Sequence, residues 1–190
     1  MITIYYLCGG YAVGYFSQFL KSVKNIYVDT PKKIVLITND SKMTLFDEYE
    51  KNNVSIEVHL DNELSIIPLN KIDELQKFIS NGSDYSIFIN PNAMFINEVE
   101  DISLLNNKLY FGYIDKQNEN NESQEYYGFG SIVYGPTEIF NKAIKFGRDY
   151  EFVEDENRTD EQKFIRFIEL NPTTTEYRES SDLYKFIDEE

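Results

Sequence analysis

The chain has 190 residues, of which 42% are apolar and 15% aromatic, so it is long enough to bury the core of one domain. Its 18 basic and 33 acidic residues give a net charge of −15, which excludes the basic footprint of a nucleic-acid-binding protein. A single cysteine, Cys8, and a single histidine, His59, exclude an internal disulfide, a CxxC zinc site and a metal site built from several histidines. Because no apolar run is long enough to cross a membrane and the first ten residues lack a basic signal-peptide start, we expect a cytoplasmic protein without a transmembrane segment.

The first half of the chain alternates short apolar runs with segments of helical periodicity. Strands are expected at Thr3–Cys8, Lys33–Thr38, Val54–His59 and Ile87–Ile89. Helices are expected at Tyr15–Val23, Thr44–Lys51 and Asn70–Ile79. This alternation predicts an α/β fold with a mostly parallel central sheet and helices on both of its faces.

The second half is less regular. Strands are expected at Leu109–Tyr113 and Tyr127–Gly135, and helices at Glu138–Phe146 and Asp160–Leu170. The polar segment 118–125 is expected to form a loop, and the tail after Thr173 is acidic.

Two polar loops follow expected strands. Gly9-Gly10 ends the first strand, and Asn90-Pro91-Asn92 ends the fourth, where proline stops a central ladder. Ligands of parallel sheets bind at the carboxyl ends of the strands, so topology makes both loops candidate sites.

The loop after the first strand has a second interpretation. Residues 9–14 have the spacing GGxxxG, which differs from the GxGxxG of a dinucleotide-binding turn, and Asp29 follows at the distance of a ribose-binding acid. No Walker lysine follows, which excludes a P-loop. A different α/β nucleotide-binding enzyme built on this turn is therefore an alternative.

The other motifs also have a structural and a functional interpretation. Asn90-Pro91-Asn92 is typical of a turn, but its amides can hydrogen-bond sugar hydroxyls or phosphates, and they hold Mg²⁺ or Mn²⁺ only weakly without a carboxylate. The alternating glycines and aromatics of Tyr127–Gly135 fit a core strand or a sugar site. Asp160-Glu161 fits a favourable helix N-terminus or a carboxylate aimed at a ligand.

Taken in chain order, these segments resemble glycosyltransferase family six, which includes the blood-group A/B transferases and α-1,3-galactosyltransferases. The family's strand-end pattern D-Y-[apolar]₃-D-x-D-x-x-F is similar to Asp84 through Phe95, with Asn90 and Asn92 in place of the two acids. Four further segments are similar to family motifs: Tyr6 to Tyr11, Tyr127 to Gly135, Asp160 to Phe167, and Thr174 to Tyr177. The chain departs from the family at Arg158-Thr159, where Trp-His is usual, and at Gly135-Pro136, where Gly-Gly is usual.

The resemblance implies one GT-A-type nucleotide-sugar-binding domain over residues 1–190. Its parts are a nucleotide-binding half at 1–95, an acceptor and catalytic half at 96–175, and a lid-like tail at 176–190. The implied activity is that of a retaining hexosyltransferase, which moves galactose, N-acetylgalactosamine or glucose from a UDP-sugar to a glycan hydroxyl in α linkage. Since amides replace the acidic ligands, neither Mn²⁺ nor another cofactor is expected. An inactive UDP-sugar-binding module is a further alternative.

The resemblance also assigns roles to single residues. Glu161 is the expected catalytic residue, either as the nucleophile of a two-step displacement or as electrostatic support for an oxocarbenium-like transition state. The expected donor-binding residues are Tyr6, Leu7, Cys8, Tyr11, Lys71, Asn90, Asn92, Phe129, Gly130, Ser131, Asp160 and Lys185. Tyr127 and Thr159 are expected to contact the acceptor, and Arg178 is a further cation for the diphosphate.

Overall fold

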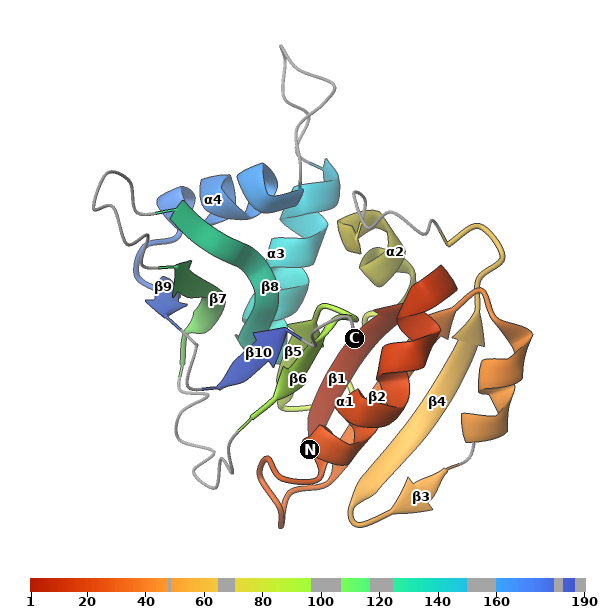
Figure 1. The fold of residues 1–190 in the computed structure, drawn as a ribbon. Coiled ribbons are helices and arrows are strands. Elements are labelled where there is room, and N and C mark those ends of the chain that lie inside the picture. Colours follow the sequence, from red (N-terminus) through yellow and green to blue (C-terminus); the bar gives the residue numbers. More distant parts are fainter. Residues whose placement is uncertain are drawn as a thin grey trace.

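An eight-stranded mixed sheet forms the centre of the computed structural model (Figure 1). The structure describes residues 1–47, 49–64, 71–96, 107–116, 125–149, 160–179 and 183–186, and at positions 11, 12, 71, 113–116, 125–131, 160, 161, 179 and 186 it describes only the backbone. The sheet is built from β1 (Ile2–Cys8), β2 (Lys32–Thr38), β3 (Glu50–Lys51), β4 (Val54–Leu60), β5 (Tyr85–Ile89), β7 (Leu109–Lys116), β8 (Glu125–Pro136) and β9 (Thr175–Glu179). A separate two-stranded sheet consists of β6 (Ala93–Phe95) and β10 (Tyr184–Phe186).

The strand order is β3-β4-β2-β1-β5-β8-β7-β9. The pairings β4-β2, β2-β1, β1-β5 and β7-β9 are parallel, whereas β3-β4, β5-β8 and β8-β7 are antiparallel. All seven residues of β1 are buried, as is typical of a strand covered on both faces by other elements. The expected α/β class with a mostly parallel sheet flanked by helices is confirmed.

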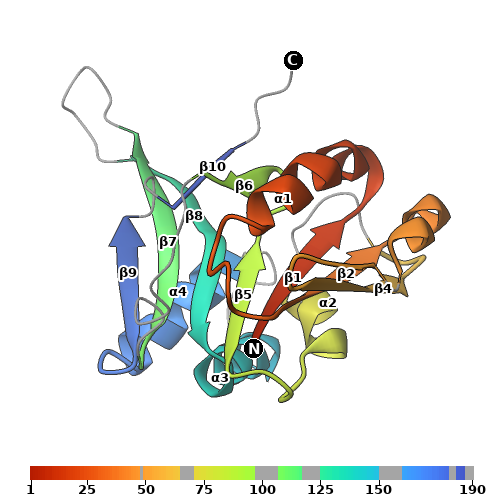
Figure 2. The ribbon, with the colours of Figure 1, turned by 90° about the horizontal axis from the view of Figure 1, so that it is seen from below.

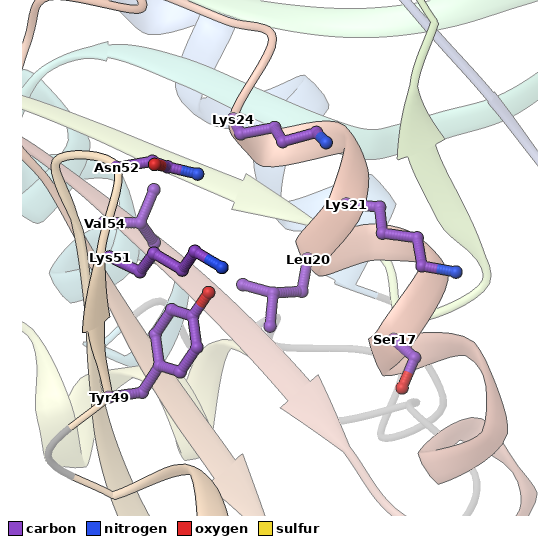
Figure 3. Close-up of a pocket in the computed structure, with 8 residues that line it drawn as sticks. All are labelled: Ser17, Leu20, Lys21, Lys24, Tyr49, Lys51, Asn52 and Val54. Atoms are coloured by element: carbon purple, nitrogen blue, oxygen red, sulfur yellow. The ribbon is translucent and has the colours of Figure 1, made fainter.

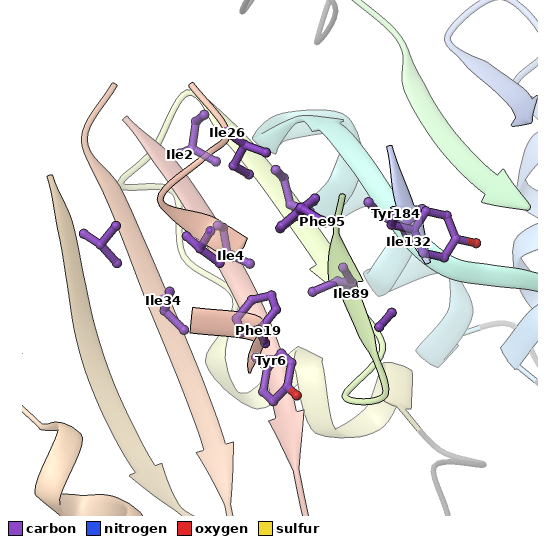
Figure 4. Close-up of a cluster of buried hydrophobic side chains, with 14 of the residues drawn as sticks. Ile2, Ile4, Tyr6, Phe19, Ile26, Ile34, Ile89, Phe95, Ile132 and Tyr184 are labelled. Atoms are coloured by element: carbon purple, nitrogen blue, oxygen red, sulfur yellow. The ribbon is translucent and has the colours of Figure 1, made fainter. Parts of the chain in front are cut away.

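Helices and the small sheet cover the two faces of the large sheet (Figure 2). The helices are α1 (Phe16–Val23), α2 (Lys71–Phe78), α3 (Thr137–Asp149) and α4 (Asp160–Leu170), and the 3₁₀ helices are η1 (Gly10–Tyr15) and η2 (Ser41–Phe46). On one face, α1 and the β6–β10 sheet bury a first cluster, which includes Ile4, Tyr6, Phe19, Phe95 and Tyr184 (Figure 4). On the other face, α2, α3 and α4 bury a second cluster, which includes Tyr5, Ile72, Phe88, Phe140 and Phe164.

The helix expected at Thr44–Lys51 is wrong. Residues 41–46 form the 3₁₀ helix η2, and residues 50 and 51 form β3, which pairs antiparallel with β4. Asn52 and Asn53 connect these two strands with φ angles of +54° and +59°. Two successive residues at positive φ make the tight turn of a two-residue hairpin, and such a turn ends any helix before it.

The other expected helices and strands are present, with ends shifted by a few residues. The tail differs from expectation, because it contributes β9 to the large sheet and β10 to the small one. The expected loop at 118–125 lies outside the described residues except for Glu125, which opens β8. Within the described ranges, no helix combines the length and the apolar character needed to cross a membrane.

Candidate functional site

The order of the strands reverses at β1. β2 and β4 lie on one side of β1, and β5, which follows them in the chain, lies on the other side. The loops that leave two such strands diverge, and open α/β sheets bind their ligands there, beyond the carboxyl ends of the strands. We call this region the switch-point edge and define it by residues 7–10 of β1 and its loop and by residues 90–92 after β5.

At the switch-point edge, β1 is longer than β5. The register between β1 and β5 ends where Tyr6 lies opposite Ile89, whereas the register between β1 and β2 continues to Cys8 opposite Thr38. The backbone of Leu7 and Cys8 therefore borders the turn after β5. Leu7 and Cys8 are among the residues that the family resemblance assigns to donor binding.

Tyr6 connects the two sides of the switch-point edge. Its side chain is fully buried, its ring stacks on Phe19 of α1 at a centroid distance of 4.2 Å, and its hydroxyl donates a hydrogen bond to the carbonyl oxygen of Pro91. Burial, with smaller contributions from Cys8 and Tyr15, raises the pKa of Tyr6 above its ordinary value, so the phenol remains a neutral donor. Tyr6 is thus a positioning residue, which fixes the turn after β5 against β1 and α1.

The glycine loop after β1 is also fixed by a side chain. Gly10 has a φ of +58°, which favours glycine, and its N–H donates to Oδ1 of Asn39 at 3.3 Å. The Nδ2 of Asn39 donates in turn to the carbonyl of Leu64 at 3.2 Å. Asn39, directly after β2, is not among the residues predicted from the sequence. Its position at the end of an expected strand is a sequence feature that points to it.

The loop does not have the form of a dinucleotide-binding turn. Gly10 opens the 3₁₀ helix η1, and the α-helix begins only at Phe16, so no α-helix N-terminus lies at the glycines to receive a pyrophosphate. Asp29 precedes β2 and therefore lies at the amino ends of the strands, away from the glycine loop. The interpretation of Asp29 as a ribose-binding acid beside this loop is wrong.

Cys8 is a buried thiol at the end of β1. Burial, and secondarily the carboxylate of Asp40, raise its pKa to about 12. The thiolate is the reactive form of cysteine, so Cys8 does not act as a nucleophile near neutral pH.

The turn after β5 presents two amides. Asn90 is half-buried, Asn92 is exposed, and the carbonyl of Asn90 accepts a hydrogen bond from the N–H of Ala93 at 3.0 Å. This hydrogen bond closes the turn and starts β6 directly behind it. The interpretation of Asn90-Pro91-Asn92 as a turn is confirmed, and this turn lies at the switch-point edge. Ligand binding by its amides stays a prediction.

The C-terminal strand β10 lies against this turn. It pairs antiparallel with β6, with Lys185 opposite Met94 and Phe186 opposite Ala93. Tyr184 is buried in the first cluster, while the Lys185 side chain is exposed. Lys185 and Asn92, more than 90 residues apart in sequence, therefore lie within two register positions of each other, and Asn90 lies two residues further along the turn.

The glycine- and aromatic-rich strand β8 reaches the same edge. It runs antiparallel to β5, and Ile132 lies opposite Ile89, the last residue of β5. Residues 125–131 therefore continue beyond the carboxyl end of β5, where β7 pairs with them. The backbone of Tyr127, Phe129, Gly130 and Ser131 belongs to this extension.

Two helices that carry predicted site residues approach from the other face. α2 follows the carboxyl end of β4 and returns to the amino end of β5, so Lys71 opens it on the side of the switch-point edge. α4 opens with Asp160 and Glu161, and one turn later the ring of Phe164 lies 5.1 Å from that of Phe111. Phe111 lies in the same row as Val133 of β8 and Phe88 of β5.

Several predicted site residues have side chains outside the described part of the molecule: Lys71, Asp160, Glu161, Tyr11, Tyr127, Phe129 and Ser131. Thr159 lies outside it altogether.

Arg178 is not brought to the switch-point edge. It lies on the outermost strand β9, opposite Gly112 of β7, and its guanidinium lies 5.5 Å from the ring centre of Tyr110. Three strand spacings of about 4.8 Å separate β9 from β5, or roughly 14 Å.

No group of three or more carboxylate, histidine or cysteine side chains with metal-site geometry occurs among the residues that the structure describes. Asn90 and Asn92, in the turn after β5, carry neutral amides, which alone bind Mg²⁺ or Mn²⁺ weakly.

No family model and no curated protein matches this sequence. The resemblance to glycosyltransferase family six thus stays a prediction from the motifs.

Proposed function

We propose that the protein is a retaining glycosyltransferase that moves a hexose or N-acetylhexosamine from a UDP-sugar to a glycan hydroxyl, in α linkage and without a metal. The observation that carries the proposal is the meeting of Gly9-Gly10, Asn90-Pro91-Asn92, β8 and Lys185 at the switch-point edge. A nucleotide-sugar needs polar groups for its hydroxyls and phosphates together with an extended surface for the sugar, and this edge offers both kinds of group.

The diphosphate sets the main electrostatic demand. The molecule has a net charge of −15, so negative charge on a departing UDP must be stabilised by local cations or by oriented N–H donors. Lys185 on β10 and Lys71 at the start of α2 are the proposed cations, and the amides of Asn90 and Asn92 are the proposed neutral donors. The neutral amides of asparagine can donate hydrogen bonds directly to an anion. A pair of carboxylates repels the anion unless a metal ion lies between them.

In the proposed reaction, the bond between the anomeric carbon and the β-phosphate oxygen breaks, and its electron pair leaves with UDP. A bond from the acceptor oxygen to the anomeric carbon forms, and the departing phosphate accepts the hydroxyl proton. Retention follows if Glu161 first forms a covalent glycosyl intermediate, or if the acceptor attacks on the face from which UDP departs while Glu161 supports the positive charge on the sugar.

The test is release of UDP from a panel of UDP-sugars, with and without saccharide acceptors, in excess EDTA. We expect turnover in EDTA equal to that of the untreated enzyme for at least one donor, and an α-linked product by NMR. A strict requirement for Mn²⁺ would contradict the metal-free part of the proposal. Binding of UDP-sugars without any UDP release would favour the inactive binding module, and binding of NAD without UDP would favour the other nucleotide-binding enzyme.

Glu161→Gln separates catalysis from binding. We expect it to lower turnover by about 10²–10³-fold while leaving UDP affinity unchanged, because it removes charge from the transition state only. Glu169→Gln is the matched control, since Glu169 lies on the same helix, is exposed and pairs with Arg166 at 2.8 Å. Equal turnover of the Glu161 variant and the wild type would remove Glu161 from the mechanism.

A further inference from the structure

A second candidate site lies along α1, on the side that faces the β3–β4 hairpin. It is a cavity of about 270 Å³ between α1 and the β3–β4 hairpin (Figure 3). α1 is joined to the end of β1 by η1, and its last turn lies near the amino end of β4, where Val54 lines the cavity. The cavity is therefore separate from the proposed UDP-sugar site.

Among the residues that the structure describes, three lysines and no acidic residue line this cavity. Lys21 and Lys24 come from the last turn of α1 and its C-cap, and Lys51 comes from β3. A helix C-terminus attracts cations, which accounts for Lys21 and Lys24 but not for Lys51 on a different element. In a chain with 33 acidic residues against 18 basic ones, such a local excess of positive charge stands out from the average surface.

These lysines make no ion pair with the described residues. Lys33, Lys77, Lys108 and Lys142, in contrast, each contact a carboxylate. At physiological ionic strength, charges more than about 8 Å away are largely screened. Charges that lie far from the cavity, which make up most of the net charge of the molecule, therefore contribute little to the field inside it.

The remaining lining is apolar or neutral. Leu20, Tyr49 and Val54 supply an apolar wall, and all three pack against or within the first cluster. In Figure 3 the Lys51 ammonium and the Tyr49 hydroxyl point from the hairpin toward Leu20. Ligand sites combine an apolar wall with a few polar groups. Here the Lys51 ammonium and the Tyr49 hydroxyl lie beside the apolar wall, whereas the Lys21 side chain points away from the hairpin.

The hairpin side of the cavity is held by backbone hydrogen bonds. The carbonyl of Tyr49 accepts from the N–H of Ile56 at 3.0 Å, and the carbonyl of Asn53 accepts from the N–H of Lys32 at 2.8 Å. The Nδ2 of Asn53 donates to the carbonyl of Val28 at 3.2 Å. The wall that carries Lys51 is therefore fixed to β2 and to the loop before it.

We propose that this cavity binds a small organic anion, whose phosphate, sulfate or carboxylate group is held by the lysines and whose apolar body lies against Leu20, Tyr49 and Val54. The site is independent of the proposed transferase activity. Its ligand is small, because the cavity lies just below the 300–1,000 Å³ of drug-sized sites.

The test is calorimetric titration of the full chain at low salt with phenyl phosphate, which combines an anion with an apolar ring. We expect saturable binding that weakens as NaCl is added, with weaker binding of inorganic phosphate and of phenol. Lys24→Gln/Lys51→Gln should weaken phenyl phosphate binding at least about tenfold, because it removes two charged donors. Both lysines are exposed, so the variant should keep its fold, which circular dichroism checks.

The control is Lys42→Gln/Lys145→Gln, which removes the same amount of charge at two exposed lysines outside the cavity. The control should bind like the wild type. No saturable binding, or an equal loss in both double variants, overturns the proposal. Displacement of phenyl phosphate by UDP also overturns it, because the probe would then occupy the nucleotide site. The titration measures binding and not turnover, so failure of the transferase proposal would leave its result unaffected.

Discussion

Tyr6 holds three elements together through one buried side chain. Its ring contacts Phe19 of α1, and its hydroxyl bonds the turn at Pro91. We expect Tyr6→Phe to lower the free energy of unfolding by about 1–2 kcal/mol, because the Pro91 carbonyl loses its donor. We also expect weaker UDP binding, because Asn90 and Asn92 flank the released carbonyl. Urea denaturation and UDP titration measure the two effects.

Tyr5 offers a matched control on the same strand. It is also fully buried, but it faces the second cluster, and its hydroxyl accepts a hydrogen bond from the N–H of Ser80 at 3.1 Å. Tyr5→Phe should cost a similar amount of stability and leave UDP binding unchanged. If both variants weaken UDP binding equally, the effect is general destabilisation and Tyr6 has no positioning role.

At the scale of the element, β8 lies close against the backbone of residues 108 and 109 at Gly135. Gly135 has a φ of +157°, and a Cβ placed there would lie 2.5 Å from the carbonyl oxygen of Lys108 and 2.9 Å from Cα of Leu109. Both neighbours are backbone atoms, so relief requires that β7 move away from β8. We expect Gly135→Ala to lower the free energy of unfolding by about 1–3 kcal/mol, measured by urea denaturation.

Gly14→Ala is the corresponding control. A Cβ at Gly14 meets no atom within 4 Å, so this substitution should change the free energy of unfolding by less than about 1 kcal/mol in either direction. If the Gly135 variant is as stable as the Gly14 variant, β7 and β8 can move apart at this point without lowering the free energy of unfolding.

The elements also show which signals the sequence carries. β1, β2 and β5 are predictable, because a strand buried on both faces is a largely continuous apolar run. β4 is predictable from its alternation of apolar and polar residues. Residues 44–51 do not form the expected helix, because Asn52-Asn53 makes the tight turn of a hairpin there. β10 has three residues and no local pattern, since its formation depends on pairing with β6.

At the scale of the whole molecule, the net charge of −15 opposes compaction. Each ion pair among the described residues has at least one side chain more than 40% exposed, and such pairs contribute about 0–1 kcal/mol each. We therefore expect the melting temperature to rise as NaCl increases from about 0.01 to 0.3 M, because screening weakens the repulsion more than the pairs. A fall in melting temperature would mean that the local pairs outweigh the overall repulsion.

The candidate site could be predicted only in part. The polar loops after β1 and β5 can be predicted from the sequence pattern, and they are candidate sites because ligands of such sheets bind at the strand ends. The reversal of strand order at β1 cannot be predicted, because no local signal in the sequence says which side of β1 receives β5. For the same reason, the sequence does not predict the hydrogen bond from Tyr6 to Pro91 or the cavity between α1 and the hairpin. Both depend on how the strands are arranged.

The pairing of β10 with β6 has a consequence for how the protein is made. β1, β2, β4 and β5 all lie within the first 89 residues, so these four parallel strands can assemble while the ribosome is still adding the rest. Ala93 and Phe95, both buried in the complete molecule, receive their partner strand only when residues 184–186 emerge. During synthesis this edge therefore stays open to chaperones, and translation must pass residue 186 before the tail can cover it.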